Sequence, residues 1–65
     1  MNPLYYAIES TEQGKPGVLV RYPDKGIAMS MAEQVAREKN KQLLEQWPRA
    51  INRDGAMHWF FEYRQ

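Results

Sequence analysis

The chain has 65 residues, enough for one domain spanning positions 1–65, and its formal net charge of +1 gives too weak a field to indicate a polyanionic partner by itself. It contains no cysteine, which excludes a disulfide framework, a cysteine-based zinc site and a thiol nucleophile. No apolar run approaches the roughly 18 residues that span a bilayer, so we expect a soluble, cytoplasmic protein.

Two β-prone segments near the N-terminus predict a hairpin. Residues 4–9 alternate between apolar and other side chains, and residues 18–22 are rich in β-branched and aromatic types. Residues 10–17 between them collect Ser, Thr, Gly, Lys and Pro, a composition typical of a turn or loop. We expect the core face of this hairpin to carry Leu4, Tyr6, Ile8, Val18, Val20 and Tyr22.

A helix is predicted from Ser30 to Trp47. Ser30 and Glu33 fit a capping box, in which the hydroxyl accepts from a first-turn N–H and the carboxylate reaches back to the cap. Pro48 ends the helix because it cannot donate a helical hydrogen bond. Residues 27–29 fit either the approach to the helix or a further short strand. The apolar stripe of the helix is expected to carry Met31, Ala32, Val35, Ala36, Leu43 and Trp47.

The C-terminal residues 58–64 are the most β-prone of the chain and predict the last strand, which follows a turn at Asp54-Gly55. The element order is therefore β-β-α-β. If the last strand docks beside the first, the fold is α+β, with a three-stranded antiparallel sheet in the order 2-1-3 and one helix packed on one face. In this phase Met57, Trp59, Phe61 and Tyr63 face the helix.

The sequence gives little support for catalysis. Ser30, His58 and an aspartate are present, but such a set occurs by chance in most chains of this length. His58 is the sole histidine, and no carboxylates accompany it at a metal-ligand spacing. The glycines form no phosphate-binding loop. We therefore expect no catalytic, cofactor or metal site, and an enzyme ranks third among the function classes.

The sheet face opposite the helix is the predicted interaction surface. Water-facing strands usually carry Thr, Lys, Glu or Ser, whereas this face interleaves large apolar and aromatic side chains with arginine, the types enriched at interface hot spots. The first hypothesis is a protein-binding module or a homodimer that uses this face. The predicted partner-binding residues are Tyr5, Leu19, Arg21, His58, Phe60 and Arg64.

The alternative is a small single-stranded nucleic-acid-binding domain. In that hypothesis Tyr5 and Phe60 stack on bases while Arg21 and Arg64 contact phosphates. Glu62 on the same face and the low net charge argue against it.

The layout of the whole chain resembles that of a known group of small proteins. Tyr-Tyr-Ala-Ile stands at 5–8, Ser-Met-Ala-Glu at 30–33 opens an alanine-containing helix, and Trp-Phe-Phe-Glu at 59–62 closes the chain. This layout resembles the compact β-β-α-β accessory proteins of bacteriophages and mobile elements, including some anti-CRISPR proteins. The resemblance implies a non-catalytic protein that binds and blocks a host machine. It carries no functional residue over to this sequence.

Overall fold

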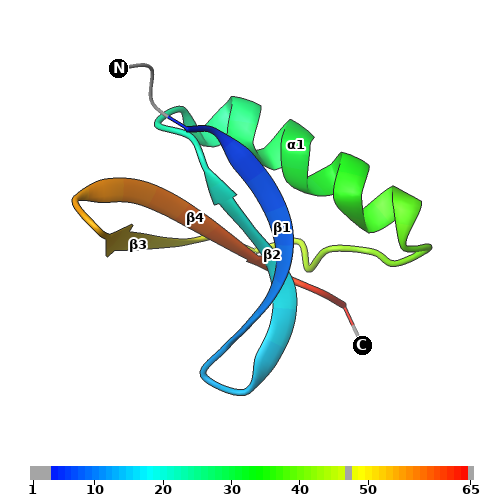
Figure 1. The fold of residues 1–65 in the computed structure, drawn as a ribbon. Helices are drawn as coiled ribbons and strands as arrows, with labels where there is room; N and C mark the ends of the chain where they lie inside the picture. Colours follow the sequence, from blue (N-terminus) through cyan, green and yellow to red (C-terminus); the bar gives the residue numbers. More distant parts are fainter. Residues whose placement is uncertain (1–3, 47, 65) are drawn as a thin grey trace.

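The computed structural model describes residues 4–46 and 48–64, and over these ranges the chain forms one helix and a four-stranded sheet (Figure 1). Every neighbouring pair is antiparallel, and the strand order is β1-β2-β4-β3. The α+β class is as predicted, but the prediction of three strands in the order 2-1-3 is wrong. The elements are β1 (Tyr6–Glu12), β2 (Lys15–Arg21), α1 (Lys25–Glu38), β3 (Arg49–Arg53) and β4 (Ala56–Glu62).

The fourth strand, β3, arises from a tight turn. Asp54 and Gly55 have φ of 55° and 73°, so this two-residue loop has the twist that folds a strand straight back on its neighbour. The polar β3 pairs along β4 through this turn. Its sequence lacks clear alternation, which is why only the turn was predicted there.

The strand order follows from which strand suits the centre of the sheet. Val18, Leu19 and Val20 of β2 are all buried, so both faces of this strand are covered. β1 carries Glu9 and Glu12 and suits an edge, where charged side chains also discourage pairing with other chains. β4 therefore docks beside β2 and not beside β1.

The first hairpin is longer than predicted. Gln13 and Gly14 have φ of 53° and 79°, and this two-residue turn lets β1 and β2 pair from Glu12↔Lys15 to Tyr6↔Arg21. Most of residues 10–17, predicted as a loop, is therefore strand.

The helix begins earlier than predicted because Asp24 is its cap. The backbone N–H of Ile27 donates to Oδ1 of Asp24 over 3.0 Å, and Lys25 is the first helical residue. This start adds a first turn that buries Ala28 against the sheet. A helix that began at Ser30 would not include Ala28. Ser30 therefore lies inside the helix, and residues 27–29 are helical, not a strand.

The helix also ends earlier, at Glu38, through a Schellman motif. Asn40 has φ of 57°, a conformation that asparagine tolerates well, and its N–H donates to the Arg37 carbonyl over 3.0 Å. The Lys41 N–H donates to the Ala36 carbonyl over 2.8 Å, which completes the motif. Trp47, the last residue of the predicted helix, lies outside the described residues.

We expect Asp24→Ala to lower the free energy of unfolding by about 1 kcal/mol, because the first-turn N–H groups lose a side-chain acceptor. Ser30→Ala is the matched control. The Ser30 hydroxyl donates only to the Gly26 carbonyl over 3.4 Å on the exposed side of α1, so its loss should change stability by less than about 0.5 kcal/mol. Urea unfolding of both variants measures the difference. A larger loss in Ser30→Ala would show that the cap is misassigned.

The main core lies between α1 and the sheet. Ala28, Ala32 and Ala36 form the buried side of the helix, and their small side chains allow a close approach to β2 and β4. On the sheet this core contains Val18, Val20, Phe61 and Tyr63, with Trp59 packed against it, as the phases of β2 and β4 predicted.

The predicted phase of the first strand is wrong. The pairs Ala7↔Val20 and Tyr6↔Arg21 place Ala7 on the helix side and Tyr6 on the other. Ala7 packs against the core, where the close approach of α1 leaves room for a small side chain. Leu4 and Ile8, both expected in the core, are exposed.

Candidate functional site

The sheet face opposite α1, called the far face below, is not the open surface that the sequence predicted. Leu19 and Phe60 each keep 2% of their surface exposed and His58 keeps 1%, so three of the six predicted partner-binding residues are buried. Arg21 is half-buried beside His58, its register neighbour in β4.

The other two predicted residues lie elsewhere. Tyr5 is exposed, and its ring packs on that of Tyr22, with 4.6 Å between the ring centroids. Arg64 is exposed after the end of β4 and its side chain reaches Gln42. The structure therefore does not bring the six residues together as one surface.

Polar side chains from the two edge strands meet across the far face. Arg53 Nη2 of β3 lies 2.9 Å from Oε1 of Glu12 in β1, and Arg49 Nη1 donates to Oε1 of Gln13 over 2.8 Å. The Ser10 hydroxyl donates to the second oxygen of Glu12 over 2.9 Å. The hydrogen bond from Arg53, followed by that from Ser10, lowers the pKa of Glu12.

The buried histidine has both ring nitrogens bonded. His58 Nδ1 lies 3.0 Å from the carbonyl oxygen of Ala56, and because a carbonyl can only accept, Nδ1 donates this hydrogen bond. Nε2 lies 2.7 Å from the Tyr6 hydroxyl oxygen, within hydrogen-bond distance. With both nitrogens engaged and 1% of the residue exposed, His58 holds β1 to β4 and presents no free nitrogen to a ligand.

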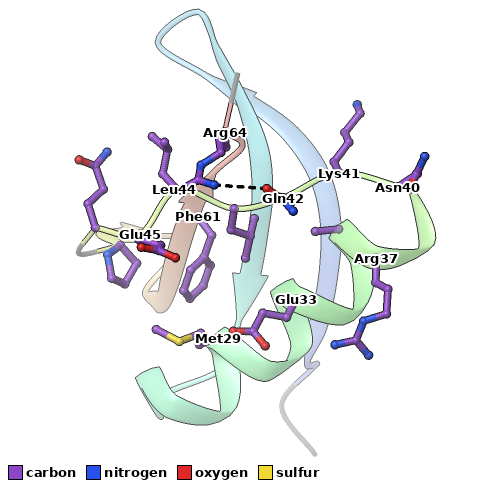
Figure 2. A pocket seen from close by; sticks show the side chains of 14 residues that line it. Met29, Glu33, Arg37, Asn40, Lys41, Gln42, Leu44, Glu45, Phe61 and Arg64 are labelled. Atoms are coloured by element: carbon purple, nitrogen blue, oxygen red, sulfur yellow. Dashed lines mark hydrogen bonds between the residues drawn. The ribbon is translucent and has the colours of Figure 1, made fainter.

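A groove of about 1200 Å³ lies on the other side of the molecule, between α1, the connection that follows it, and the end of β4 (Figure 2). We call it the α1–β4 groove. Phe61 projects into it from β4, Met29 lies at the end nearer the start of α1, and Leu44 lies on the wall formed by the connection. It is lined by Met29, Glu33, Ala36, Arg37, Asn40, Lys41, Gln42, Leu43, Leu44, Glu45, Gln46, Pro48, Phe61 and Arg64.

Backbone hydrogen bonds fix the outer wall of this groove. After Asn40 turns the chain out of α1, Leu43 pairs with Tyr63 as an isolated β-bridge. The Leu44 N–H donates to the Glu62 carbonyl over 2.8 Å, and the Arg64 N–H donates to the Gln42 carbonyl over 2.6 Å. The connection thus continues the outer edge of the sheet beyond β3 and is held in place along β4.

Side-chain contacts tie the same wall to β1. The Tyr63 hydroxyl donates to Oε2 of Glu9 over 2.7 Å, and Lys41 Nζ lies 3.4 Å from that oxygen and 4.7 Å from the centre of the Tyr63 ring. The hydrogen bond from Tyr63 and the charge of Lys41 lower the pKa of Glu9. Burial and the hydrogen bond to Glu9 raise the pKa of Tyr63.

The lining of the groove is suited to binding. Its deeper part is apolar, formed by the buried Phe61 and Ala36 and the half-buried Leu43, while charged side chains occupy the rim. Met29 leaves 39% of its surface exposed. No imidazole, hydroxyl or thiol group lines the groove among the described residues. An extended chain with an apolar side chain is the kind of ligand that such a lining can hold.

Sequence reasoning missed most of this groove. Arg64 is the one residue that it shares with the predicted surface. The signal that could have found it is Asn40, because asparagine is a common residue just past a helix end. A helix ending there would have turned Leu43 and Leu44 from helical positions into a wall beside the sheet.

Known proteins offer no guide to the function of this site. No protein-family model matches the chain, and no curated protein or solved structure matches it either. Within residues 4–46 and 48–64, no three His, Asp or Glu side chains are grouped to hold a metal ion. No helix in the same ranges has the length and apolar character needed to cross a membrane.

Proposed function

We propose that the protein is a non-catalytic protein-binding module that holds an extended segment of its partner in the α1–β4 groove. The observation that carries the proposal is the groove itself, an apolar floor at Phe61 bounded by a charged rim and left open at Met29. Burying one large apolar side chain of a partner there would contribute about 1.5–3 kcal/mol before the costs of association.

The fixed wall supports this proposal further. Because the backbones of Leu44 and Gln42 are bonded to those of Glu62 and Arg64, little of that wall has to be ordered when a ligand binds. Inhibition of a host complex, the role implied by the resemblance to phage accessory proteins, belongs to the same proposal, since blocking a complex requires only a binding surface.

The nucleic-acid hypothesis has less support. It relied on Phe60 as a stacking platform, and this ring keeps 2% of its surface exposed. Tyr5, the other aromatic residue in that hypothesis, packs on Tyr22 and lies away from Arg21, on the helix side of the sheet.

The test is a selection from a random peptide library displayed on phage, followed by titration of the selected peptide. We expect Met29→Glu to weaken its binding by about tenfold or more, because a charge replaces an apolar contact at the open end of the groove. Gln34→Glu is the matched control, since it adds the same charge to an exposed position of α1 outside the groove lining.

Equal binding by the parent and Met29→Glu would contradict the groove as the site, and failure to select any peptide would contradict a peptide-binding role. A parallel titration with single-stranded oligonucleotide at low and raised salt tests the alternative, because phosphate contacts give binding a steep salt dependence. Tight, salt-dependent binding there would favour the nucleic-acid hypothesis.

A further inference from the structure

The two hairpins of the sheet are joined across the far face by contacts between strands that are not neighbours. β1 and β3 are the two edges of the sheet, with β2 and β4 between them. A right-handed twist brings one pair of diagonal corners of such a sheet toward the same face. At these corners Glu12 and Arg53 form their ion pair, and Arg49, at the other end of β3, donates a hydrogen bond to Gln13 beyond the end of β1. We call the first of these contacts the Glu12–Arg53 latch.

A thin apolar layer lies on the face that the latch spans. Leu19 and Phe60 are register neighbours in β2 and β4, and each is 2% exposed. No helix packs on this face within the described residues. The register places Arg49 of β3 beside Phe60, and Gln46 and Pro48 of the connection also lie near this ring. The register places Ile8 of β1 beside Leu19, and Ile8 itself is exposed. The exposure of this layer therefore depends on the edge strands keeping their positions beside it.

The α1 layer does not depend on the latch. α1 packs on β1, β2 and β4 through residues of the opposite face, whereas the β3–β4 hairpin projects away from the helix (Figure 1). β3 is paired along one side only, to β4. Its two arginines provide the described polar side-chain contacts to the first hairpin, and exposed contacts of this kind are weak.

We propose that the Glu12–Arg53 latch is a conformational gate: its release lets the edge strands β1 and β3 move apart across the far face, with β2 and β4 still paired, and exposes Leu19 and Phe60 as a second apolar surface while the α1 layer stays folded. Opening of this kind is a local event, with a smaller free energy than global unfolding. The proposal is independent of the α1–β4 groove, whose walls lie on the other side of the sheet.

Amide hydrogen exchange tests the gate directly. Glu12→Gln removes the charge of the latch, and we expect exchange in β3 and at the end of β1 to accelerate by about two- to fivefold while the amides of α1 exchange at the parent rate. The matched control is Glu38→Gln on the exposed side of α1, which should change neither region.

A charge-swapped variant, Glu12→Arg with Arg53→Glu, separates the ion pair from other effects of the substitution. We expect the swap to return exchange in β3 toward the parent rate. Three results would overturn the proposal: unchanged exchange in Glu12→Gln, equal acceleration of α1 and β3, which indicates global destabilisation, or a swapped variant that exchanges as fast as Glu12→Gln.

Discussion

Phe60→Ala is expected to lower the free energy of unfolding by about 3–5 kcal/mol, a large fraction of the roughly 5–15 kcal/mol that a domain possesses. The ring is 2% exposed and lies between Leu19 and the backbone of Gly17. Truncation removes its apolar contacts and leaves a cavity that the paired strands cannot close, since their register is fixed by hydrogen bonds on both sides of β4. Urea unfolding followed by tryptophan fluorescence measures the loss.

Met57→Ala is the matched control for this prediction. Met57 belongs to the same strand and is of similar size, but 42% of its surface is exposed, so its truncation should cost less than about 1 kcal/mol. If Phe60→Ala unfolded at the parent urea concentration, the far face would be open, as the alternation of the sequence first suggested, and the burial described here would be wrong.

Much of the local structure could be predicted from the sequence, because it depends on neighbouring residues. Strand alternation placed Val18, Val20 and Phe61 on the helix side, and the Asp54-Gly55 pair marked a turn. The start of the helix was predicted wrongly, because Ser30 and Glu33 match a capping box although the cap is Asp24. A start at Lys25 is favoured by the sheet beneath, on which the helix buries Ala28.

The strand order and the phase of β1 could not be predicted, because they depend on contacts between distant residues. Glu9 lies on the helix side, where its carboxylate accepts from the hydroxyl of Tyr63, a residue 54 positions away. No local sequence pattern indicates that this pair forms. A one-residue change of phase moves every side chain of a strand to the other face. Tyr6 therefore lies on the far face and not on the predicted helix side, and its hydroxyl bonds to His58.

The predicted interaction surface differs from the structure for a related reason. The sequence identified Leu19 and Phe60 as unusual on a water-facing strand and placed His58 on the same face, and the structure buries all three. Tyr6 of β1 lies on His58, and Arg49 and Pro48 lie beside Phe60. The twist that brings the two edge strands toward each other is a property of the assembled sheet. The groove likewise requires the helix end at Asn40 and the bridge between Leu43 and Tyr63 to be known together.

Gly17→Ala is expected to destabilise the fold by about 1–3 kcal/mol, the usual cost of inserting a carbon into a filled space. A Cβ at position 17 would overlap the carbonyl oxygen of Phe61, and it would lie 2.7 Å from Cζ of Phe60 and 3.0 Å from Cα of Glu62. Two of these three atoms belong to the backbone of β4, so relief requires the paired strands to separate. This cost outweighs the gain of about 0.5–1 kcal/mol that alanine normally brings over glycine within a strand or helix.

Gly26→Ala provides a matched control for this last prediction. Gly26 lies in the first turn of α1, where an added Cβ would lie 3.3 Å from Oδ1 of Asp24, the oxygen that caps the helix. This contact offsets part of the usual gain from alanine, so stability should stay within about 0.5 kcal/mol of the parent or rise. Urea unfolding of the two variants should therefore shift in opposite directions, or shift for Gly17→Ala alone. A Gly17→Ala variant as stable as the parent would mean that β2 and β4 are less closely packed at this point. The large destabilisation expected for Phe60→Ala would then also be in error, because it depends on the close packing of Phe60 over Gly17.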